Sequence, residues 1–279
     1  MNYTITLLAE NTTYRHNVLA QHGQSILIES DTQRLLFDVG EVPGAVTHNL
    51  TQLGLQISDI AVIAISHRHI DHIGALVEML EDMGDQRLLL PMQLGEPDNK
   101  PAKESYSFLT PNPDGGYDVG ISREHAERIT AYRHSETVTG GFEVIPGIFT
   151  TGCIGDQMKE QAMVIDQKET GITVITGCSH PGVHELITEA VNVTGNSRIR
   201  GVIGGFHFTD MTDDEIREHA IRFQDYGLEF LVPGHCTTVR GAQILQNVLG
   251  ELVKLSKTAT FGTGNSLSLT KDSIKWNFV

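Results

Sequence analysis

Four short apolar segments of this chain are each followed within a few residues by histidine, and this repeated placement limits the folds that the sequence can adopt. The run "IAVIAI" leads directly into "SHRHIDHIGAL", while "GITVITGCSH", "RGVIGGFHF" and "LEFLVPGHC" carry His180, His207 and His235 at or near their ends. The runs are rich in β-branched residues and bounded by polar or glycine-containing turns, as buried β-strands are. The carboxyl ends of strands are where α/β proteins usually assemble their sites.

The periodicity elsewhere predicts helices that alternate with strands. Helical spacing covers residues 43–54, 72–84, about 182–193 and about 241–253, and a further helix is expected to begin with the capping-box pair Thr212 and Glu215 and to stop near Gly227. Additional strands are expected at "YTITLLA", "SILIES", "RLLFDVG", "GFEVIPGIFTTG", "QAMVIDQ" and "SLSLT". We therefore expect an α/β chain with mixed strand connections, forming one domain over residues 1–279.

One segment interrupts this alternation. Five of the nine prolines lie between Pro91 and Pro113, and no strong period emerges before about Gly141. Long irregular loops in compact domains often contact substrate. We expect an insertion at about residues 91–141, acting either as a lid or as an oligomer contact.

Charge and cysteine content narrow the classes of function. The chain has 20 Lys and Arg against 35 Asp and Glu, a formal net charge of −15, which argues against general affinity for nucleic acid or anionic membranes. We find neither a basic-then-apolar leader nor an apolar run of about 18 residues, so the cytoplasm is the expected compartment. The three cysteines cannot all pair in disulfides. A small-molecule partner is expected, and the oligomeric state is left open.

The stretch from His67 to His72 concentrates potential metal ligands behind a buried strand. Side chains at i and i+2 of an extended segment point the same way, so His67 and His69 should aim at one point. The turn into the next helix should aim Asp71 and His72 at another. A metal centre normally needs three or more protein ligands. The other strand ends can supply them, through His180, His207 and His235.

The pattern H-x-H-x-D-H, followed by "GCSHPG", "GGFH" and "VPGHC", resembles the metallo-β-lactamase fold superfamily. "GGFH" and "TGCSH" are similar to the branch named for an archaeal 7,8-dihydropterin-6-methyl-4-(β-D-ribofuranosyl)aminobenzene 5′-phosphate synthase. The resemblance runs from "QHGQSILIE" and "LLFDVG" to the terminal strand. It implies an αββα sandwich of two facing mixed β-sheets flanked by helices, with metals at one edge.

The resemblance also implies roles for individual residues. A first metal would be bound by His67, His69 and His180, and a second by Asp71, His72 and His235. Asp38 matches an aspartate that orients the ligand loop through hydrogen bonds without binding metal. A turn-forming role is the alternative for Asp38.

One departure from the superfamily concerns the aspartate that often bridges the two metals. Here the corresponding strand leads to His207, with Asp210 three residues later. We expect His207 to face the site as a ligand or a proton-transfer group, and the second site to be weaker, differently bridged or empty. Cys178 and Cys236 are interpreted as small buried residues rather than ligands, because neighbouring strand side chains face opposite ways.

The histidines outside these motifs are assigned no role. Surface positions are expected for His16, His125, His134, His184 and His219. His22 is left open, because it lies in a segment that the resemblance brings near the site.

The expected chemistry follows from the metals. A bound divalent ion lowers the pKa of its water and stabilises developing negative charge, so we predict a metal-dependent hydrolase of a small ester, lactone or phosphoester. Asp71 and His207 are the expected catalytic residues. One or two ions are expected, zinc first, with iron or manganese as alternatives. A transferase like the branch's namesake and a non-catalytic metal-dependent ligand sensor are the alternative functions. Arg68, inside the motif, either contacts an anionic substrate or forms a structural ion pair.

Overall fold

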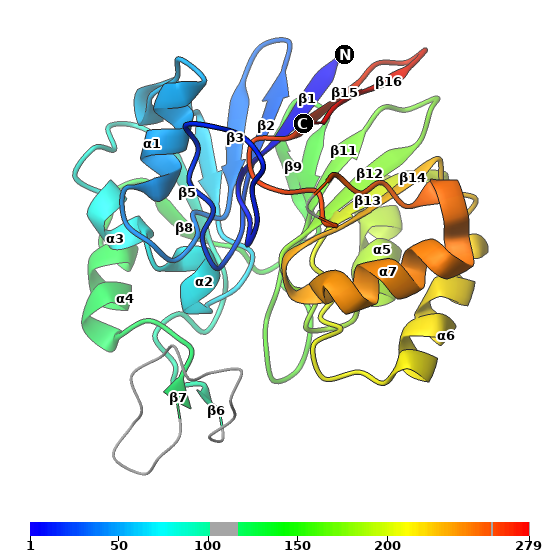
Figure 1. Ribbon diagram of the computed structural model, residues 1–279. Helices are drawn as coiled ribbons and strands as arrows, with labels where there is room; N and C mark the ends of the chain where they lie inside the picture. The colour runs from blue at the N-terminus through cyan, green and yellow to red at the C-terminus, as the bar shows by residue number, and fades with distance from the viewer. Residues whose placement is uncertain (101–116, 258, 279) are drawn as a thin grey trace.

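A computed structural model describes residues 1–100, 117–257 and 259–278 and arranges them in four layers, with two facing sheets between two layers of helices (Figure 1). Within the described residues, the first sheet has eight strands and the second has six. The first sheet runs in the order β16 (Ile274–Asn277), β15 (Ser266–Leu269), β1 (Tyr3–Ala9), β2 (Ser25–Ser30), β3 (Arg34–Phe37), β4 (Val62–Ala64), β5 (Arg87–Leu90) and β8 (Ser135–Thr137).

The second sheet is also mixed. Its order is β14 (Phe230–Pro233), β13 (Ile199–Gly204), β12 (Ile172–Thr176), β11 (Met163–Asp166), β10 (Ile148–Thr150) and β9 (Phe142–Ile145). β12, β13 and β14 pair in parallel, as do β3, β4, β5 and β8 in the first sheet, and the remaining pairings are antiparallel. The carboxyl ends of parallel neighbours meet at one edge, which gathers the loops that follow them.

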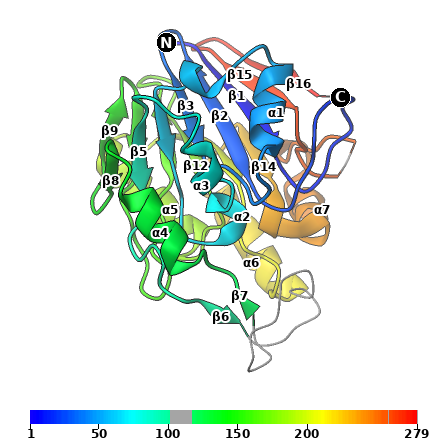
Figure 2. The same ribbon diagram turned by 90° about the vertical axis from the view of Figure 1, so that its left-hand side faces the viewer.

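Helices cover the outer face of each sheet. Figure 2 shows α1 (Ala45–Gln52), α3 (Leu76–Met79) and α4 (Arg123–Thr130) in front of the first sheet, with α2 (Ile70–Ile73) below α3. The second sheet is covered by α5 (Val183–Thr194), α6 (Asp213–Gln224) and α7 (Thr238–Leu249) (Figure 1). Short 3₁₀ turns are η1 (Ile57–Asp59), η3 (His235–Thr237) and η4 (Gly250–Leu252). The predicted capping box of α6 is confirmed, since Thr212 and Glu215 bond each other reciprocally.

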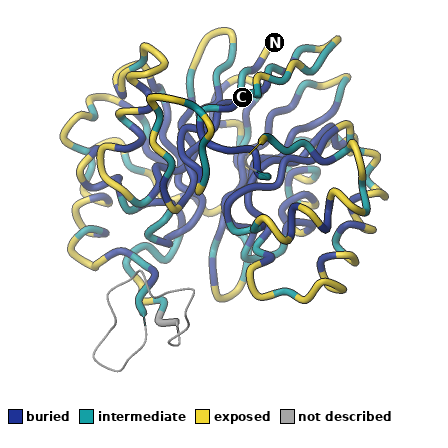
Figure 3. The backbone as a smooth tube through the Cα atoms, viewed as in Figure 1, coloured by how far each residue is buried: buried dark blue, intermediate teal, exposed yellow. Residues whose placement is uncertain are grey.

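The hydrophobic core lies in three layers. One cluster, which includes Phe37, Ile148 and Phe230, fills the space between the two sheets. A second packs under α1 to α4 and a third under α5 to α7. Figure 3 shows the central strands buried and the helices exposed along their outer sides. The predicted α/β class and αββα order are therefore confirmed.

The boundaries of the 91–141 insertion need correction. Its second half contributes to the scaffold: α4 buries Ala126 and Ile129 against the first sheet's helical layer, and β8 pairs with β5. No sequence pattern indicated this, because α4 has few apolar residues and β8 is a short, mostly polar edge strand. β6 (Asn99–Lys100) and β7 (Tyr117–Asp118) pair at the base of the segment, and residues 101–116 lie outside the described part of the chain.

Three further boundaries differ from the expectation. The helix expected over 72–84 is two short helices, α2 and α3, that meet at Gly74 and Ala75. α7 begins at Thr238, three residues early, and β16 follows the strand expected to be last. None of the described helices combines the length and the apolar character that a bilayer-spanning helix needs.

Candidate metal centre

The predicted site residues lie together at one rim of the sandwich. The loop from Ser66 to His72 follows β4, His180 follows β12, His207 follows β13, and His235 follows β14. These loops approach one another closely. A Cβ on Gly177 would lie 2.3 Å from the Ser66 hydroxyl, and one on Gly205 would lie 2.5 Å from the Gly177 carbonyl oxygen. Glycine at 177 therefore lets a loop of the second sheet meet the loop after β4 in the first, and glycine at 205 lets the loops after β12 and β13 pack together.

The first group consists of His67, His69 and His180. Nδ1 of His69 lies 3.1 Å from Nε2 of His67 and 3.1 Å from Nε2 of His180. Nε2 of His69 lies 2.7 Å from an oxygen of Asp98. Because a carboxylate accepts, that nitrogen carries the proton, and the lone pair on Nδ1 faces the other two rings.

Burial keeps the first group ready for a cation. It lowers the pKa of His67 and of His180 well below the ordinary value, and neighbouring imidazoles lower both further. It also lowers the pKa of His69, although the Asp98 hydrogen bond acts in the opposite direction. Neutral imidazole is the form that binds metals.

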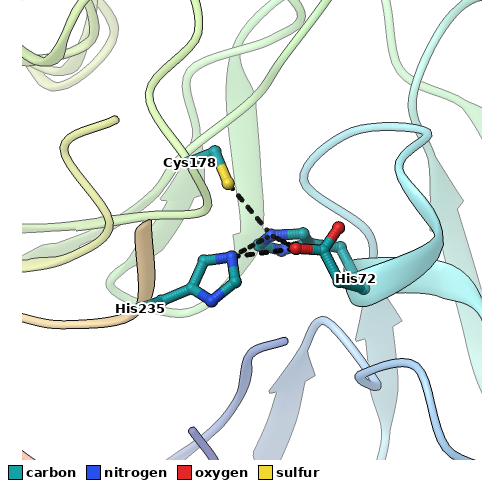
Figure 4. Close-up of side chains that lie close together, drawn as sticks. His72, Cys178 and His235 are labelled. Atoms are coloured by element: carbon teal, nitrogen blue, oxygen red, sulfur yellow. Dashed lines mark hydrogen bonds and ion pairs between the residues drawn. The ribbon is translucent and has the colours of Figure 1, made fainter. Parts of the chain in front are cut away.

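The second group consists of Asp71, His72, Cys178 and His235, three of which Figure 4 labels. Nε2 of His235 lies 3.0 Å from a carboxylate oxygen of Asp71 and 3.1 Å from Nε2 of His72. The outer ring nitrogens have their own partners, since Nδ1 of His72 lies 2.7 Å from Asp38 and Nδ1 of His235 lies 3.1 Å from the Asn11 amide oxygen. Both inner nitrogens therefore point into the group, where each can bind a cation once it carries no proton.

Charge in the second group is balanced around His72. Burial alone would lower the pKa of His72, but the carboxylates of Asp38 and Asp71 outweigh it and raise that pKa to about 9. Burial would raise the pKa of Asp71, but His72 and His235 hold it well below its ordinary value. Without a cation, the protein therefore balances these carboxylates with a protonated imidazole, a charge that a metal ion would replace.

Both groups have the spacing that a small cation requires. Ligand atoms about 2.0–2.1 Å from a tetrahedral zinc are separated by about 3.3 Å, close to the 3.1 Å between ring nitrogens here. In each group the ligand atoms all lie within 4.8 Å of one another. Imidazole, carboxylate and thiolate together suit zinc and other first-row transition ions. Each group also draws side chains from both sheets, because His180, Cys178 and His235 follow strands of the second sheet.

Cys178 corrects the sequence interpretation that it is only a small buried residue. Its sulfur lies 3.2 Å from Nε2 of His72 and points at the second group (Figure 4). It also belongs to a third set with His180 and His207. The strand alternation used for the sequence interpretation does not apply at Cys178, because β12 ends at Thr176 and Ser179 has a left-handed φ of 66°.

His207 lies against the first group. Its ring centroid is 4.2 Å from that of His180, and its backbone N–H donates to the Cys236 sulfur at 3.3 Å. Its Nδ1 is buried, with no hydrogen-bond partner in the described part of the chain. Asp210 is exposed and belongs to none of the three ligand sets found among the described residues. His207, and not Asp210, therefore lies beside the ligand groups.

Asp38 is fully buried behind the ligand loop. Its two oxygens accept from the Ser66 N–H at 2.7 Å and the Ser66 hydroxyl at 2.9 Å, besides holding His72. Through these contacts Asp38 orients the ligand loop and the His72 ring, which a residue that only formed a turn would not do.

Two supporting carboxylates were not predicted. Glu160 is fully buried and accepts the backbone N–H groups of Ser179 and His180, each at 2.8 Å. Burial raises the pKa of Glu160 to about 7 despite those bonds. An acidic residue opening the apolar run "EQAMVI" was its only signal. Asp98, the partner of His69, lies in the proline-rich segment, where no period marked it.

The histidines assigned no role lie in several environments. His16 and His134 are exposed as expected, and His125 and His219 are half-buried. The surface assignment of His184 is wrong, because it is 1% exposed, stacks on His219 and bonds the Tyr226 hydroxyl. α5 turns it towards α6, a tertiary contact that no local motif encodes. His22 lies near the second group, with Nε2 3.9 Å from Asp71.

The backbone at the centre is strained. Left-handed φ angles occur at Asp38 (62°), Ser179 (66°), His207 (54°) and His235 (48°). Non-glycine residues rarely adopt this conformation, and such residues cluster where function requires an exact side-chain direction.

Comparison with known proteins extends these findings. A family model for the anti-Pycsar protein Apyc1 matches residues 14–86. The chain is 26% identical over 280 residues to the 7,8-dihydropterin-6-methyl-4-(β-D-ribofuranosyl)-aminobenzene-5′-phosphate synthase of Methanocaldococcus jannaschii, covering 85% of this chain and 88% of that protein. It is 27% identical over 278 residues to the uncharacterized protein MJ0448 of the same organism, covering 94% and 97%.

Two solved structures share the architecture along nearly the whole chain. Tm1679, described as a metal-dependent hydrolase of the β-lactamase superfamily, matches with a TM-score of 0.72 and 23% identity, covering 96% of this chain and 98% of that one. The metallo-β-lactamase fold protein YhfI from Bacillus subtilis matches with a TM-score of 0.58 and 15% identity, covering 96% and 99%. The fold that the sequence motifs indicated is confirmed, and the similarity to the M. jannaschii synthase agrees with the branch they indicated.

Proposed function

We propose that this chain, which has the metallo-β-lactamase fold, is a metal-dependent hydrolase of a small ester, lactone or phosphoester. One observation carries the proposal: two adjacent groups of side chains bring imidazole nitrogens, a carboxylate and a thiol together around two points. A structural metal site is closed by its own ligands, whereas a catalytic one keeps a position open. The first group offers three protein ligands, which leaves such a position.

The side chains divide the work of hydrolysis. A divalent cation held here would supply Lewis acidity to a carbonyl or phosphoryl oxygen and lower the pKa of water. Asp71 is partly accessible, with 13% of its side chain exposed, and its carboxylate can accept a hydrogen bond from the attacking water. His207 lies beside His180, and its Nδ1 has no hydrogen-bond partner among the described residues, so its imidazole can pass a proton to the leaving group. Zinc is our first choice of ion, and a dinuclear centre our first choice of stoichiometry.

A transferase is the second candidate. It is favoured by the similarity to the M. jannaschii synthase, which extends over most of both chains. A synthase would use the same cations to activate a substrate group and would have to exclude water from the attack. A non-catalytic ligand sensor is the third candidate and would bind without turnover.

The test combines metal analysis with an activity screen. Metal-loaded protein is assayed with 4-nitrophenyl esters, lactones, thioesters and bis-4-nitrophenyl phosphate, and separately for condensation of a dihydropterin with a phosphorylated aminobenzene riboside. We expect hydrolysis that a chelator abolishes and zinc restores. His69→Ala should remove at least one equivalent of metal and the activity while the circular dichroism spectrum is retained.

The matched control is His134→Ala, which replaces an exposed histidine outside the centre. It should keep both metal and activity. Condensation without hydrolysis would select the transferase. Full activity in His69→Ala would contradict the assignment of the centre.

A further inference from the structure

A cavity of about 650 Å³ adjoins the first metal group. His180 of that group and Asp98, the partner of His69, both line it. Part of its wall is apolar, from Ile154, Met158 and Pro181, and part is polar. A molecule bound in this cavity would therefore lie beside the first group and could contact both polar and apolar lining residues.

Arg68 lines the same cavity and is a buried cation, with only 7% of its side chain exposed. Its Nη1 donates to the Gln93 amide oxygen at 2.9 Å. Among the described residues its one ion pair is a long one, 3.8 Å to the exposed Glu96. Neither Nε nor Nη2 has a hydrogen-bond partner in the described part of the chain.

Such an arrangement is costly unless something binds to it. A buried charge normally has a paired, hydrogen-bonded partner. The planar guanidinium matches the two oxygens of a carboxylate or phosphate group better than any neutral ligand. The amide of Gln93 and a distant Glu96 leave that bidentate face unused.

We propose that Arg68 recognises an anionic oxo group, carboxylate or phosphate, at the end of the substrate that is not attacked. This inference rests on the proposed function, because it assigns the reacting group to the metal centre and the anion to Arg68, which lines the same cavity. The apolar residues Ile154, Met158 and Pro181 in that lining suit a short hydrocarbon stem. The substrate class is then a small ester, lactone or phosphoester that carries a second, anionic group.

The carboxylates that line the cavity suggest the main alternative, a substrate whose second group is cationic. Asp98 is engaged by His69 at 2.7 Å, whereas Asp156 and Glu185 also line the cavity and would favour a cationic group. The charge of the second group on the ligand that binds more tightly therefore shows whether Arg68 or the carboxylates recognise it.

The test measures binding, so it does not depend on turnover. Isothermal titration of metal-loaded protein compares propionate with α,ω-dicarboxylates from succinate to adipate, with 3-phosphonopropionate and with β-alanine. All share one carboxylate that can reach the metal centre, and they differ in the second group. We expect at least one dianionic ligand to bind tenfold or more tighter than propionate, and β-alanine to bind no tighter.

Variants then assign the preference to Arg68. Arg68→Gln should abolish the dianion preference while propionate affinity changes less than twofold. Arg68→Lys keeps the positive charge but loses the planar guanidinium that can bind two oxygens, so it should retain a reduced preference. The control is Arg123→Gln, which removes an exposed arginine on α4 and should leave the preference unchanged. A purely structural role would lower the melting temperature without altering the ratio between ligands.

The outcomes separate the two proposals. A dianion preference that survives in Arg68→Gln, or tighter binding of β-alanine, would overturn the role of Arg68. The carboxylate and phosphonate arms identify which oxo group is recognised. An Arg68-dependent preference in a protein that hydrolyses nothing would leave this inference standing and reject the hydrolase.

Discussion

Oδ2 of Asp38 lies 2.7 Å from Nδ1 of His72, and neither side chain is exposed to solvent. The same carboxylate also holds the first residue of the ligand loop, through the Ser66 N–H and hydroxyl. Asp38 therefore fixes both the path of the loop and the ring nitrogen of His72 that stays free for a cation.

Asp38→Asn should weaken metal binding at the second group without removing any ligand. The amide has one acceptor oxygen and no charge, so it cannot hold both Ser66 and His72 as the carboxylate does. Loss of such a partner typically costs about 10- to 100-fold in metal affinity. Competition titration with a chromogenic chelator should show this loss for one of two metal equivalents. Asp31→Asn, an exposed substitution, should leave both equivalents unchanged, and an unaltered titration for Asp38→Asn would remove the orienting role.

Cys178→Ser should abolish a thiolate-to-metal signal in the cobalt-substituted protein. The Cys178 sulfur lies in the second group, 3.2 Å from Nε2 of His72, so Co²⁺ bound there should give a near-ultraviolet charge-transfer band. Cys236→Ser is the control, because the described ligand sets include Cys178 and not Cys236. A band that persists in Cys178→Ser and vanishes in Cys236→Ser would assign the sulfur ligand to the wrong residue.

His184 should make the stability of the fold depend on pH. Burial, assisted by Arg222 and His219, lowers the pKa of His184 to about 3. Above pH 6.5 the residue is neutral in both states, so its contribution is fully present. As pH falls below 6.5, the unfolded chain takes up a proton on His184 that the folded chain does not. The free energy of unfolding therefore decreases as pH falls from 6.5 towards the pKa of the folded state, about 3.

This loss should approach about 1.4 kcal/mol per pH unit. Urea denaturation of metal-free protein between pH 6.5 and 5 measures it. His184→Gln, which keeps a polar group near Tyr226, should flatten the slope, and His134→Gln at an exposed position should not. Equal slopes in all three proteins would mean that His184 takes up its proton in the folded state.

Glycine should stabilise position 207 relative to alanine. His207 has a φ of 54°, a conformation that costs a residue with a Cβ about 1 kcal/mol or more. We therefore expect metal-free His207→Gly to exceed His207→Ala by about 1 kcal/mol in free energy of unfolding, measured by urea denaturation. The same pair at Glu218, an exposed position within α6, should show the opposite order, because glycine weakens a helix by about 1 kcal/mol. The same order at both positions would argue against strain at His207.

Local chemistry made the fold and most of the centre predictable. Strand ends marked His180, His207 and His235, and a dense motif marked the loop after β4. The alternation of strands and helices was strong wherever elements bury an apolar face. It failed at α4 and β8, which lie at an edge and carry mostly polar residues.

The missed residues share a different cause. Asp98 reaches His69 across 29 positions of sequence, and Glu160 reaches the loop after β12 across about 20. Such contacts depend on how the two sheets dock, and no periodicity within a single element encodes them. Cys178 lies in the loop after β12, where the left-handed Ser179 breaks the strand alternation from which its direction was inferred.

The division of each ligand group between the two sheets has a consequence for how the protein assembles. Neither half of the sandwich alone holds a complete set of ligands, so tight capture of a cation must await the docking of the halves. A bound ion would link the two sheets, and its binding free energy would add to the stability that the apolar layer between them provides. Cellular metal supply would then govern how long the mature protein persists as well as how fast it works.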